Sequence, residues 1–178
     1  MTAALLDRPS INGSCALPWC MSAWDHDRDS SGGNSDLLHY GRPSFVESYD
    51  GDSVNVVPYQ FSGSEETTGV RVEVGAGNEG RHQIPLTPDR AFDFAVAIFK
   101  SATDDLIQNA IFKDEHGRMA TVFAGKRLVH HGRYDYWLVK LSFFDADDGD
   151  QPVEVELRDL DAAHYARFVE AAAVEVTR

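Results

Sequence analysis

The sequence predicts an α+β protein in which a zinc-stapled N-terminal loop is followed by two strand-strand-helix units with antiparallel sheet. Three observations support this fold class. Several segments alternate apolar and polar residues, as half-buried strands do. Two later segments carry apolar residues at helical spacing. A polar region ahead of them contains both cysteines of the chain and two histidines.

The bulk composition is that of a folded protein with its own hydrophobic core. The chain has 178 residues, of which 43% are hydrophobic and 25% are charged, and this length suits one ordinary domain or two very small ones. We expect a flexible tail over residues 1–14, a zinc-stapled ββα unit over 15–112 and a second ββα unit over 113–178 that shares one core with the first.

The first unit is predicted to open with a hairpin. Strands over Ser44 to Tyr49 and Ser53 to Phe61 flank Asp50-Gly51-Asp52, a typical turn sequence. Val70 to Val74 alternates as a half-buried strand, and a further strand covers Arg81 to Leu86. The intervening Gly75 to Gly80 has the letters G-x-G-x-x-G, but a strand follows it, so it is interpreted as a hairpin turn and not as a dinucleotide-binding loop.

A helix is predicted to begin after Thr87. Thr87 is a suitable N-cap, Pro88 suits the first helical position, and Asp89 complements the positive end of the helix dipole. The expected buried stripe comprises Ala91, Phe94, Ala95, Ile98 and Ala102. Helical character is predicted to resume from Thr103 to Phe112.

The second unit is predicted to repeat this order of elements. The expected strands are Met119 to Phe123, Arg127 to Val129, Tyr134 to Phe144 and Pro152 to Leu157. The acidic run Asp145 to Asp150 lacks the Glu of an EF-hand loop and is interpreted as a solvated hairpin loop. A final helix starts near Asp159 to Asp161, with a buried face of Leu160, Ala163, Tyr165, Phe168 and Val169.

Two short echoes relate the halves. Leu38-His39-Tyr40-Gly41-Arg42 resembles Val129-His130-His131-Gly132-Arg133, and the pattern from Ala91 to Ile98 resembles that from Ala162 to Val169. Duplication of one unit and chance similarity between amphipathic helices both account for these echoes.

Four potential zinc ligands fall in one short region with the spacing C-x4-C-x5-H-x12-H: Cys15, Cys20, His26 and His39. Structural zinc sites take four tetrahedral N/S ligands from the protein. We therefore predict one structural Zn²⁺ at these residues, with Trp19 and Trp24 as an apolar shell. Free thiols and a Cys15–Cys20 disulfide are the alternatives, and Asp25 or Asp27 could replace His26. An open, catalytic zinc would require that one histidine is not a ligand.

The segment Cys15-Ala-Leu-Pro-Trp-Cys20, followed by His26, His39 and then strands, resembles an uncharacterised actinobacterial and actinophage domain family. Its members open with Cys-Pro-x-Trp-Cys and two histidines and close with a helix near Leu-Thr-Pro, which matches Leu86-Thr87-Pro88. The resemblance covers roughly residues 15 to 102; the spacing before Trp19 and before His26 departs from the pattern. It implies the metal site, the fold and a phage or mobile-element origin, and it implies no activity.

Charge narrows the possible partners. The 29 acidic residues outnumber 16 basic ones, for a net charge of −13, so direct binding to nucleic acid or to an anionic membrane is not expected. No secretory signal or membrane-length apolar segment is evident, so a cytoplasmic location is expected, where paired cysteines are more often metal ligands than disulfides.

The leading functional hypothesis is a non-enzymatic, zinc-containing interaction protein that binds a host protein. The alternatives are an acidic nucleic-acid mimic or transcription regulator, and a small zinc-dependent enzyme. Part of the aromatic cluster Tyr134, Tyr136, Trp137, Phe143 and Phe144 is a candidate partner surface. His130-His131 is interpreted as a polar hairpin turn, because no carboxylate partner is apparent beside it. The sequence predicts no oligomeric state.

Overall fold

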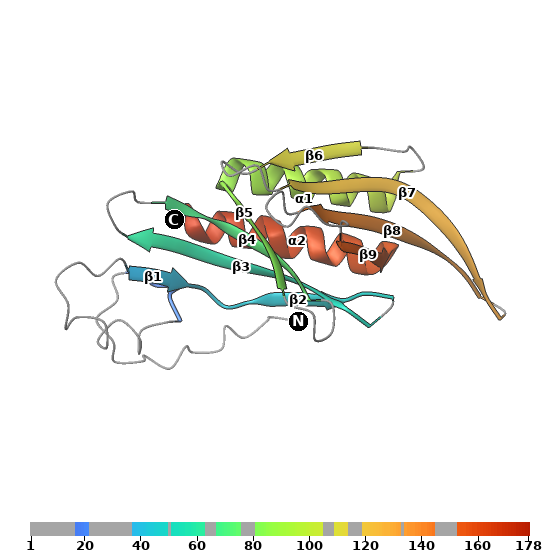
Figure 1. Cartoon of the computed structure of the whole chain (residues 1–178), viewed down its shortest axis with the longest axis horizontal. Helices are drawn as coiled ribbons and strands as arrows, with labels where there is room; N and C mark the ends of the chain where they lie inside the picture. Colours follow the sequence, from blue (N-terminus) through green and yellow to red (C-terminus); the bar gives the residue numbers. More distant parts are fainter. Residues whose placement is uncertain are drawn as a thin grey trace, which may run out of the picture.

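The protein folds into two antiparallel sheets and two helices (Figure 1). The computed structural model describes residues 17–21, 37–49, 51–62, 67–75, 81–104, 109–113, 119–132, 134–144 and 153–178. In the described part of the chain, a first sheet precedes one helix and a second sheet precedes the other, which confirms the α+β fold class.

The first sheet is built around the long strand β3. It contains β1 (Leu37–Tyr40), β2 (Ser44–Glu47), β3 (Ser53–Ser62), β4 (Thr67–Gly75) and β5 (Arg81–Leu86). The order is β1-β3-β4-β5, and β2 also pairs with β3. Strands β1 and β2 lie along the same edge of β3, since β1 pairs with its last residues and β2 with its first.

The second sheet has the order β6-β7-β8-β9. Its strands are β6 (Asn109–Lys113), β7 (Met119–His131), β8 (Tyr134–Phe144) and β9 (Val153–Arg158). The register of β7 on β8 shifts between Phe123 and Arg127. Strand β7 advances four residues there while β8 advances two, an irregularity of the kind that bends a strand pair.

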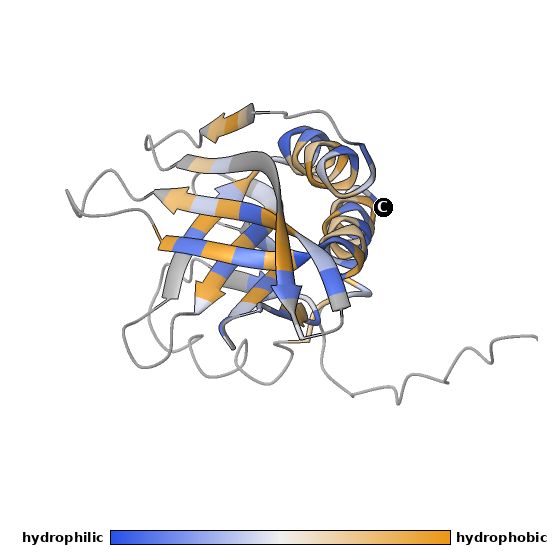
Figure 2. Cartoon of the chain, turned by 90° about the vertical axis from the view of Figure 1, so that its right-hand side faces the viewer, coloured by the Kyte–Doolittle hydropathy of each residue, from blue (hydrophilic) through white to orange (hydrophobic). Residues whose placement is uncertain are grey.

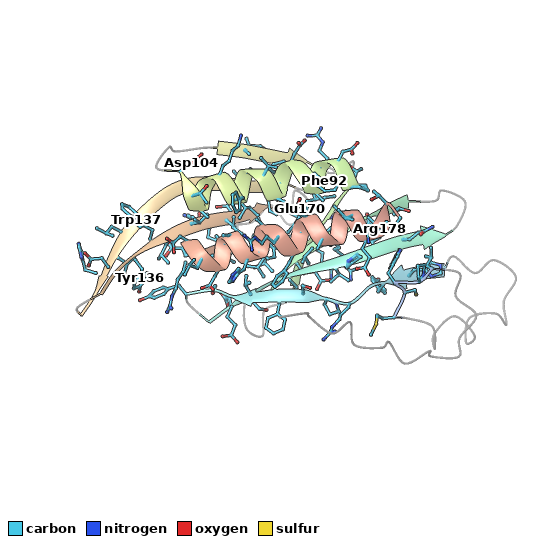
Figure 3. The ribbon with its side chains drawn as sticks, turned by 180° about the vertical axis from the view of Figure 1, so that it is seen from behind. Phe92, Asp104, Tyr136, Trp137, Glu170 and Arg178 are labelled. Carbon is cyan, nitrogen blue, oxygen red and sulfur yellow. The ribbon has the colours of Figure 1, made fainter. Side chains whose placement is uncertain are left out.

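The two helices are α1 (Pro88–Thr103) and α2 (Asp159–Val176). Thr87 caps α1 as predicted, because its side-chain oxygen accepts a hydrogen bond from Arg90 N at 3.4 Å. The helices run antiparallel and side by side: in Figure 3, Phe92 of α1 lies toward the same end as Arg178, and Asp104 lies toward the end where Tyr136 is found.

Both helices cover the same side of the strands (Figure 2). Helix α1 contacts β4 and β5 of the first sheet and β6, β7 and β8 of the second, while α2 contacts β2, β3 and β4 as well as β8 and β9. Buried residues from both sheets and both helices therefore form one cluster. A backbone hydrogen bond from Tyr49 N to Glu156 O, 2.8 Å long, also joins the first sheet to β9.

Two of the predicted segments are wrong in their secondary structure. Residues 37–40, expected within the N-terminal loop, form β1, because their backbone groups pair with the end of β3. Residues 109–112, expected to be helical, belong to β6. Phe112 turns inward there and packs edge-to-face on Phe94 with ring centroids 5.1 Å apart, whereas Ile111 is exposed.

The predicted buried face of α2 is only partly correct. Tyr165 and Val169 are buried, but Leu160 and Phe168 are exposed. The buried stripe consists instead of Ala162, Tyr165, Ala166, Val169, Ala172 and Ala173. Small alanines let α2 lie close to its neighbours, and this packing turns the two larger apolar residues outward. The two predicted strands of residues 119–129 are one strand, β7.

Candidate functional site

The N-terminal corner of the first sheet holds the described part of the predicted metal site. Cys20 N donates a hydrogen bond to Leu17 O at 3.2 Å, which closes a turn through Pro18 and Trp19. Met21 N then donates to Tyr40 O at 2.7 Å, and this bond fastens the turn to β1. Trp19 is buried at this corner.

Two predicted ligands, Cys20 and His39, belong to this corner. Cys20 precedes Met21 and His39 precedes Tyr40, so each is the chain neighbour of one partner in the 2.7 Å bond. His39 is buried and Cys20 is half-buried. The other predicted ligands, Cys15 and His26, lie outside the described residues. Eighteen positions separate Cys20 from His39 in the sequence, and the hydrogen bond from Met21 to Tyr40 brings their chain neighbours together.

The chemistry of this corner fits zinc. A cysteine and a histidine are the ligand types that structural zinc takes, and a partly buried position beside an apolar indole limits the access of water. No group of three or more His, Cys, Asp or Glu side chains suited to one metal occurs within the described ranges. Those ranges contain only two of the four predicted ligands.

A cavity of about 410 Å³ adjoins the corner on the face of the first sheet that lies opposite the core. Tyr40 and Gly41 line it beside the polar residues Asn55, Arg71 and Glu73. Gly41 is required here by close approach: its N–H donates to Pro58 O at 2.8 Å, and an added Cβ would lie 2.8 Å from Pro58 Cγ. The cavity wall is thus held against β3.

An ion pair between half-buried Arg71 and buried Glu73 lines this cavity. Arg71 Nε lies 2.7 Å from Glu73 Oε1, and only 3% of Glu73 is exposed. Arg71 also donates from Nη1 to the Tyr40 hydroxyl at 3.2 Å, and its guanidinium lies 4.6 Å from the centre of the Tyr40 ring. The Arg71 guanidinium neutralises Glu73 and stacks on Tyr40, so it connects β4 to the Cys20–His39 corner.

Glu73 also affects a phenol on α2. Tyr165 is buried, and its hydroxyl donates to Asn55 O at 3.1 Å. Burial raises the pKa of Tyr165 well above its ordinary value of 10.0, and the negative charge of Glu73 raises this pKa further. The charge of Glu73 therefore influences the pKa of Tyr165, a residue of the core.

The hairpin tip of β7 and β8 carries the predicted His130-His131 pair. The sequence interpretation missed a partner, because His130 Nδ1 lies 2.6 Å from Asp135 Oδ1 across the hairpin. Gly132 occupies the turn with φ of 66°, a conformation that glycine adopts without strain. The pair is exposed, so its contribution to stability is small.

The predicted aromatic cluster is divided between core and surface. Phe143 is buried, while Tyr136 packs on Tyr49 with ring centroids 5.5 Å apart and lies under Arg158, whose guanidinium carbon is 5.4 Å from the ring centre. Trp137 is 38% exposed. The side chains of Tyr134 and Phe144, like the Asp145 to Asp150 loop, lie outside the described set.

Comparison of the chain with protein-family models, with curated proteins and with solved structures gives no match. Among the described residues, neither helix combines the length and apolar character needed to cross a membrane.

Sequence reasoning missed the Tyr40–Arg71–Glu73 cluster. The alternation from Val70 to Val74 places Arg71 and Glu73 on the face opposite the core, which normally is solvated. Glu73 is nevertheless buried, and its position in an alternating strand gives no sign of that.

Proposed function

We propose that this chain is a non-enzymatic, zinc-stapled interaction protein that binds a partner protein through the ribbon of β7 and β8. One observation supports this most directly. Leu128 and Trp137 are direct cross-strand partners, and they are 40% and 38% exposed. The phage or mobile-element origin implied by the family resemblance remains a prediction, and so does the identification of the partner as a host protein.

The ribbon is the part of the second sheet where two strands stand without neighbours. Strand β9 pairs with β8 only from Leu138 to Phe143, and β6 pairs with β7 only from Met119 to Phe123. Beyond these limits β7 and β8 continue as a two-stranded extension, which reaches past the helices in Figure 1. The segments 127–131 and 134–137 therefore present a sheet face that no described element covers.

The exposed face of this ribbon continues the apolar face of the sheet. Trp137 shares its side of β8 with Val139 and Leu141, both buried in the core. The opposite side is anchored, because Tyr136 packs against Tyr49 and Arg158. The side chains of Trp137 and Leu128 are therefore already held in position before a partner binds. Large aromatic side chains of this kind contribute most of the binding energy in protein interfaces.

Charge at the hairpin does not favour a basic partner. Its sequence carries Lys126, Arg127 and Arg133, and its one carboxylate, Asp135, lies 2.6 Å from His130 Nδ1. The attraction to a partner therefore rests on the apolar contact of Leu128 and Trp137.

The test is partner capture followed by measurement with the purified pair. We expect Trp137→Ala to weaken binding by at least about tenfold, since hot-spot aromatics contribute about 2 kcal/mol or more. Ile111→Ala on β6 is the matched control, because Ile111 is an exposed apolar residue away from the ribbon. Titration calorimetry measures both variants. A partner that binds Trp137→Ala as tightly as wild type would exclude the ribbon as the contact.

The structural zinc is part of the same proposal. Cys15, Cys20, His26 and His39 would hold it, and the chemistry supplied is a cross-link that orders the N-terminal segment against β1. We expect one equivalent of zinc in purified protein. Cys15→Ser and His39→Ala should each lose the metal and lower the thermal midpoint, as read by elemental analysis and by calorimetry. Metal-free wild type would refute the site.

A further inference from the structure

Strand pairing places an aromatic ring and three planar polar groups in one row on the outer face of the first sheet. Phe45 of β2 pairs with Asn55 of β3, which pairs with Glu73 of β4. Glu73 in turn pairs with Gln83 of β5. Directly paired residues of antiparallel strands point to the same face, with Cβ atoms about 5 Å apart. The first three residues of the row line the cavity of about 410 Å³, and Gln83 does not.

The charges of this cavity cancel each other. Among the described residues that line it, Arg71 is the one cation and Glu73 is the one anion, and Arg71 Nε lies 2.7 Å from Glu73 Oε1. A ligand anion that Arg71 attracts is repelled by the adjacent Glu73, and the converse holds for a ligand cation. A charged ligand would also lose hydration on entering the cavity. The lining therefore favours a neutral, polar ligand over an ion.

Two polar side chains of the lining have hydrogen-bonding capacity that the described residues do not use. Arg71 has five N–H donors. Its Nη1 donates to the Tyr40 hydroxyl and its Nε lies beside Glu73, whereas Nη2 has no partner in the described ranges. The Asn55 side-chain amide has none there either, since the contact with Tyr165 uses the Asn55 backbone oxygen. Both groups are planar, and each can bind two neighbouring polar atoms of one ligand.

An apolar surface adjoins these polar groups. Phe45 is 60% exposed, although it is a large aromatic residue, and Pro43 and Val57 also line the cavity. Asn55 is the direct cross-strand partner of Phe45, so the phenyl ring and the amide meet one ligand from neighbouring strands. A matching ligand needs neutral polar groups at its edge and an apolar face. A sugar ring has this composition, because its hydroxyls donate and accept hydrogen bonds while the C–H groups of one face are apolar.

We propose that the cavity on the outer face of the first sheet binds a neutral sugar. Asn55 and Arg71 bind adjacent hydroxyl groups, and Phe45 packs on the C–H face of the sugar ring. The volume of about 410 Å³ lies within the range of about 300 to 1,000 Å³ that is usual for small-molecule sites. This site is on the first sheet and the ribbon is on the second, so the inference goes beyond the proposed function and is tested separately.

The experiment is an NMR titration of the full, isotope-labelled chain with D-glucose, D-galactose, D-mannose and N-acetyl-D-glucosamine, each added alone. A ligand with so few atoms should bind with a Kd of about 1 mM. At least one sugar is expected to shift the side-chain amide signals of Asn55. The signals of Gln83, the amide of the same row that lies outside the cavity, should not shift. Unchanged Asn55 signals with all four sugars at about 50 mM, far above this Kd, would overturn the proposal.

Two pairs of variants locate the site. Asn55→Ala should weaken binding at least about tenfold, because the amide bonds to the ligand are lost, whereas Gln83→Ala should bind like wild type. Phe45→Ala should weaken binding by a similar factor. Phe168→Ala should not, since Phe168 is also an exposed phenylalanine but does not line the cavity. Circular dichroism verifies that all four variants stay folded. Equal affinities within either pair would overturn the assignment of the sugar to this cavity.

The charge of the ligand gives a second, independent test. Arg71 and Glu73 stay unchanged in it, because removal of either one leaves the other as an uncompensated charge. The sugar that binds best is compared instead with the uronic acid and the amino sugar of the same ring, which add one charge of either sign. Both should bind at least about threefold more weakly than the neutral sugar. Tighter binding of either charged form would show that the lining does not favour a neutral ligand and would overturn the proposal.

Discussion

Tyr165 connects the chemistry of the first sheet to the core. Its hydroxyl reaches from α2 to Asn55 O, 110 positions earlier in the chain. On the opposite face of the sheet, Glu73 lies against Arg71, and its charge adds to the effect of burial on the phenol. Ionisation of Tyr165 in the folded state would therefore place a second negative charge inside the protein, where it is repelled by the Glu73 carboxylate. The folded protein keeps this phenol protonated.

This arrangement predicts a loss of stability at alkaline pH. Because the pKa of Tyr165 is higher in the folded state, its stabilising effect is complete below about pH 10, the unfolded pKa. It declines as pH rises toward the folded pKa, by up to about 1.4 kcal/mol per pH unit. Tyr165→Phe loses one hydrogen bond, worth about 1 kcal/mol, but does not ionise. The difference in the free energy of unfolding between wild type and Tyr165→Phe should therefore vanish at roughly pH 11.

Urea denaturation of wild type and Tyr165→Phe between pH 8 and pH 11.5 measures this difference. Tyr59→Phe serves as the control, because it removes a phenol that lies in the first sheet and is half-buried. A constant difference between wild type and Tyr165→Phe over the whole range would show that Tyr165 titrates alike in both states.

At the scale of single residues, the features that depend only on neighbouring residues, such as the start of a helix, were predicted correctly from the sequence. Thr87 and Pro88 define the start of α1 whatever surrounds them, and the observed cap agrees. Leu160 and Phe168 were placed in the core because they are large and apolar. Their exposure results from packing between alanine-rich helix faces, which depends on residues distant in the sequence.

Among the elements, the ribbon of β7 and β8 depends most on its turn. Two-stranded hairpins are marginally stable alone, and Gly132 adopts φ of 66° at its tip. Gly132→Ala should cost about 1 kcal/mol, because a Cβ disfavours this conformation. We expect faster amide exchange in 127–131 and 134–137, with little change in Leu138 to Phe143, where β9 also pairs.

Hydrogen exchange with mass spectrometry resolves these segments. Gly51→Ala is the matched control, since Gly51 has φ of 92° in the turn between β2 and β3. It should accelerate exchange near that turn and leave the ribbon unchanged. Uniform acceleration across the second sheet in Gly132→Ala would contradict a locally stabilised ribbon.

Strands were predicted correctly where the alternation of apolar and polar residues matches the strand pairing in the structure. The alternation of Val70 to Val74 and the turn at Asp50 to Asp52 correctly placed β4 and the hairpin of β2 with β3. Strands β1 and β6 were missed because each is short and forms on an existing sheet edge. Such edge strands are specified by the partner strand more than by their own residues.

For the whole molecule, the helices make the two sheets one cooperative unit. Phe94 of α1 packs on Phe112 of β6, and α2 packs on β3 of the first sheet. Phe94→Ala should therefore destabilise the entire protein by about 3 to 5 kcal/mol. One unfolding transition is expected before and after the change, with tryptophan fluorescence and circular dichroism giving the same midpoint. Two separated transitions in either protein would indicate that the sheets unfold independently.

The candidate metal site was predictable only in part. The Cys and His spacing proposed four residues, of which Cys20 and His39 are described, and the hydrogen bond from Met21 to Tyr40 joins their chain neighbours. The neighbouring Arg71–Glu73 pair was not predictable, because the alternating strand gives no sign that its outer face is covered.

The position of α2 on β3 has a consequence for synthesis of the protein on the ribosome. Helix α2 ends 114 residues after the end of β3, and it covers strands that were made before either helix. At about 5 to 20 residues per second, the apolar face of β3 waits roughly 6 to 23 s for its cover. During this interval the nascent chain exposes valines that the finished fold buries, so a stalled or truncated chain is a natural substrate for chaperones.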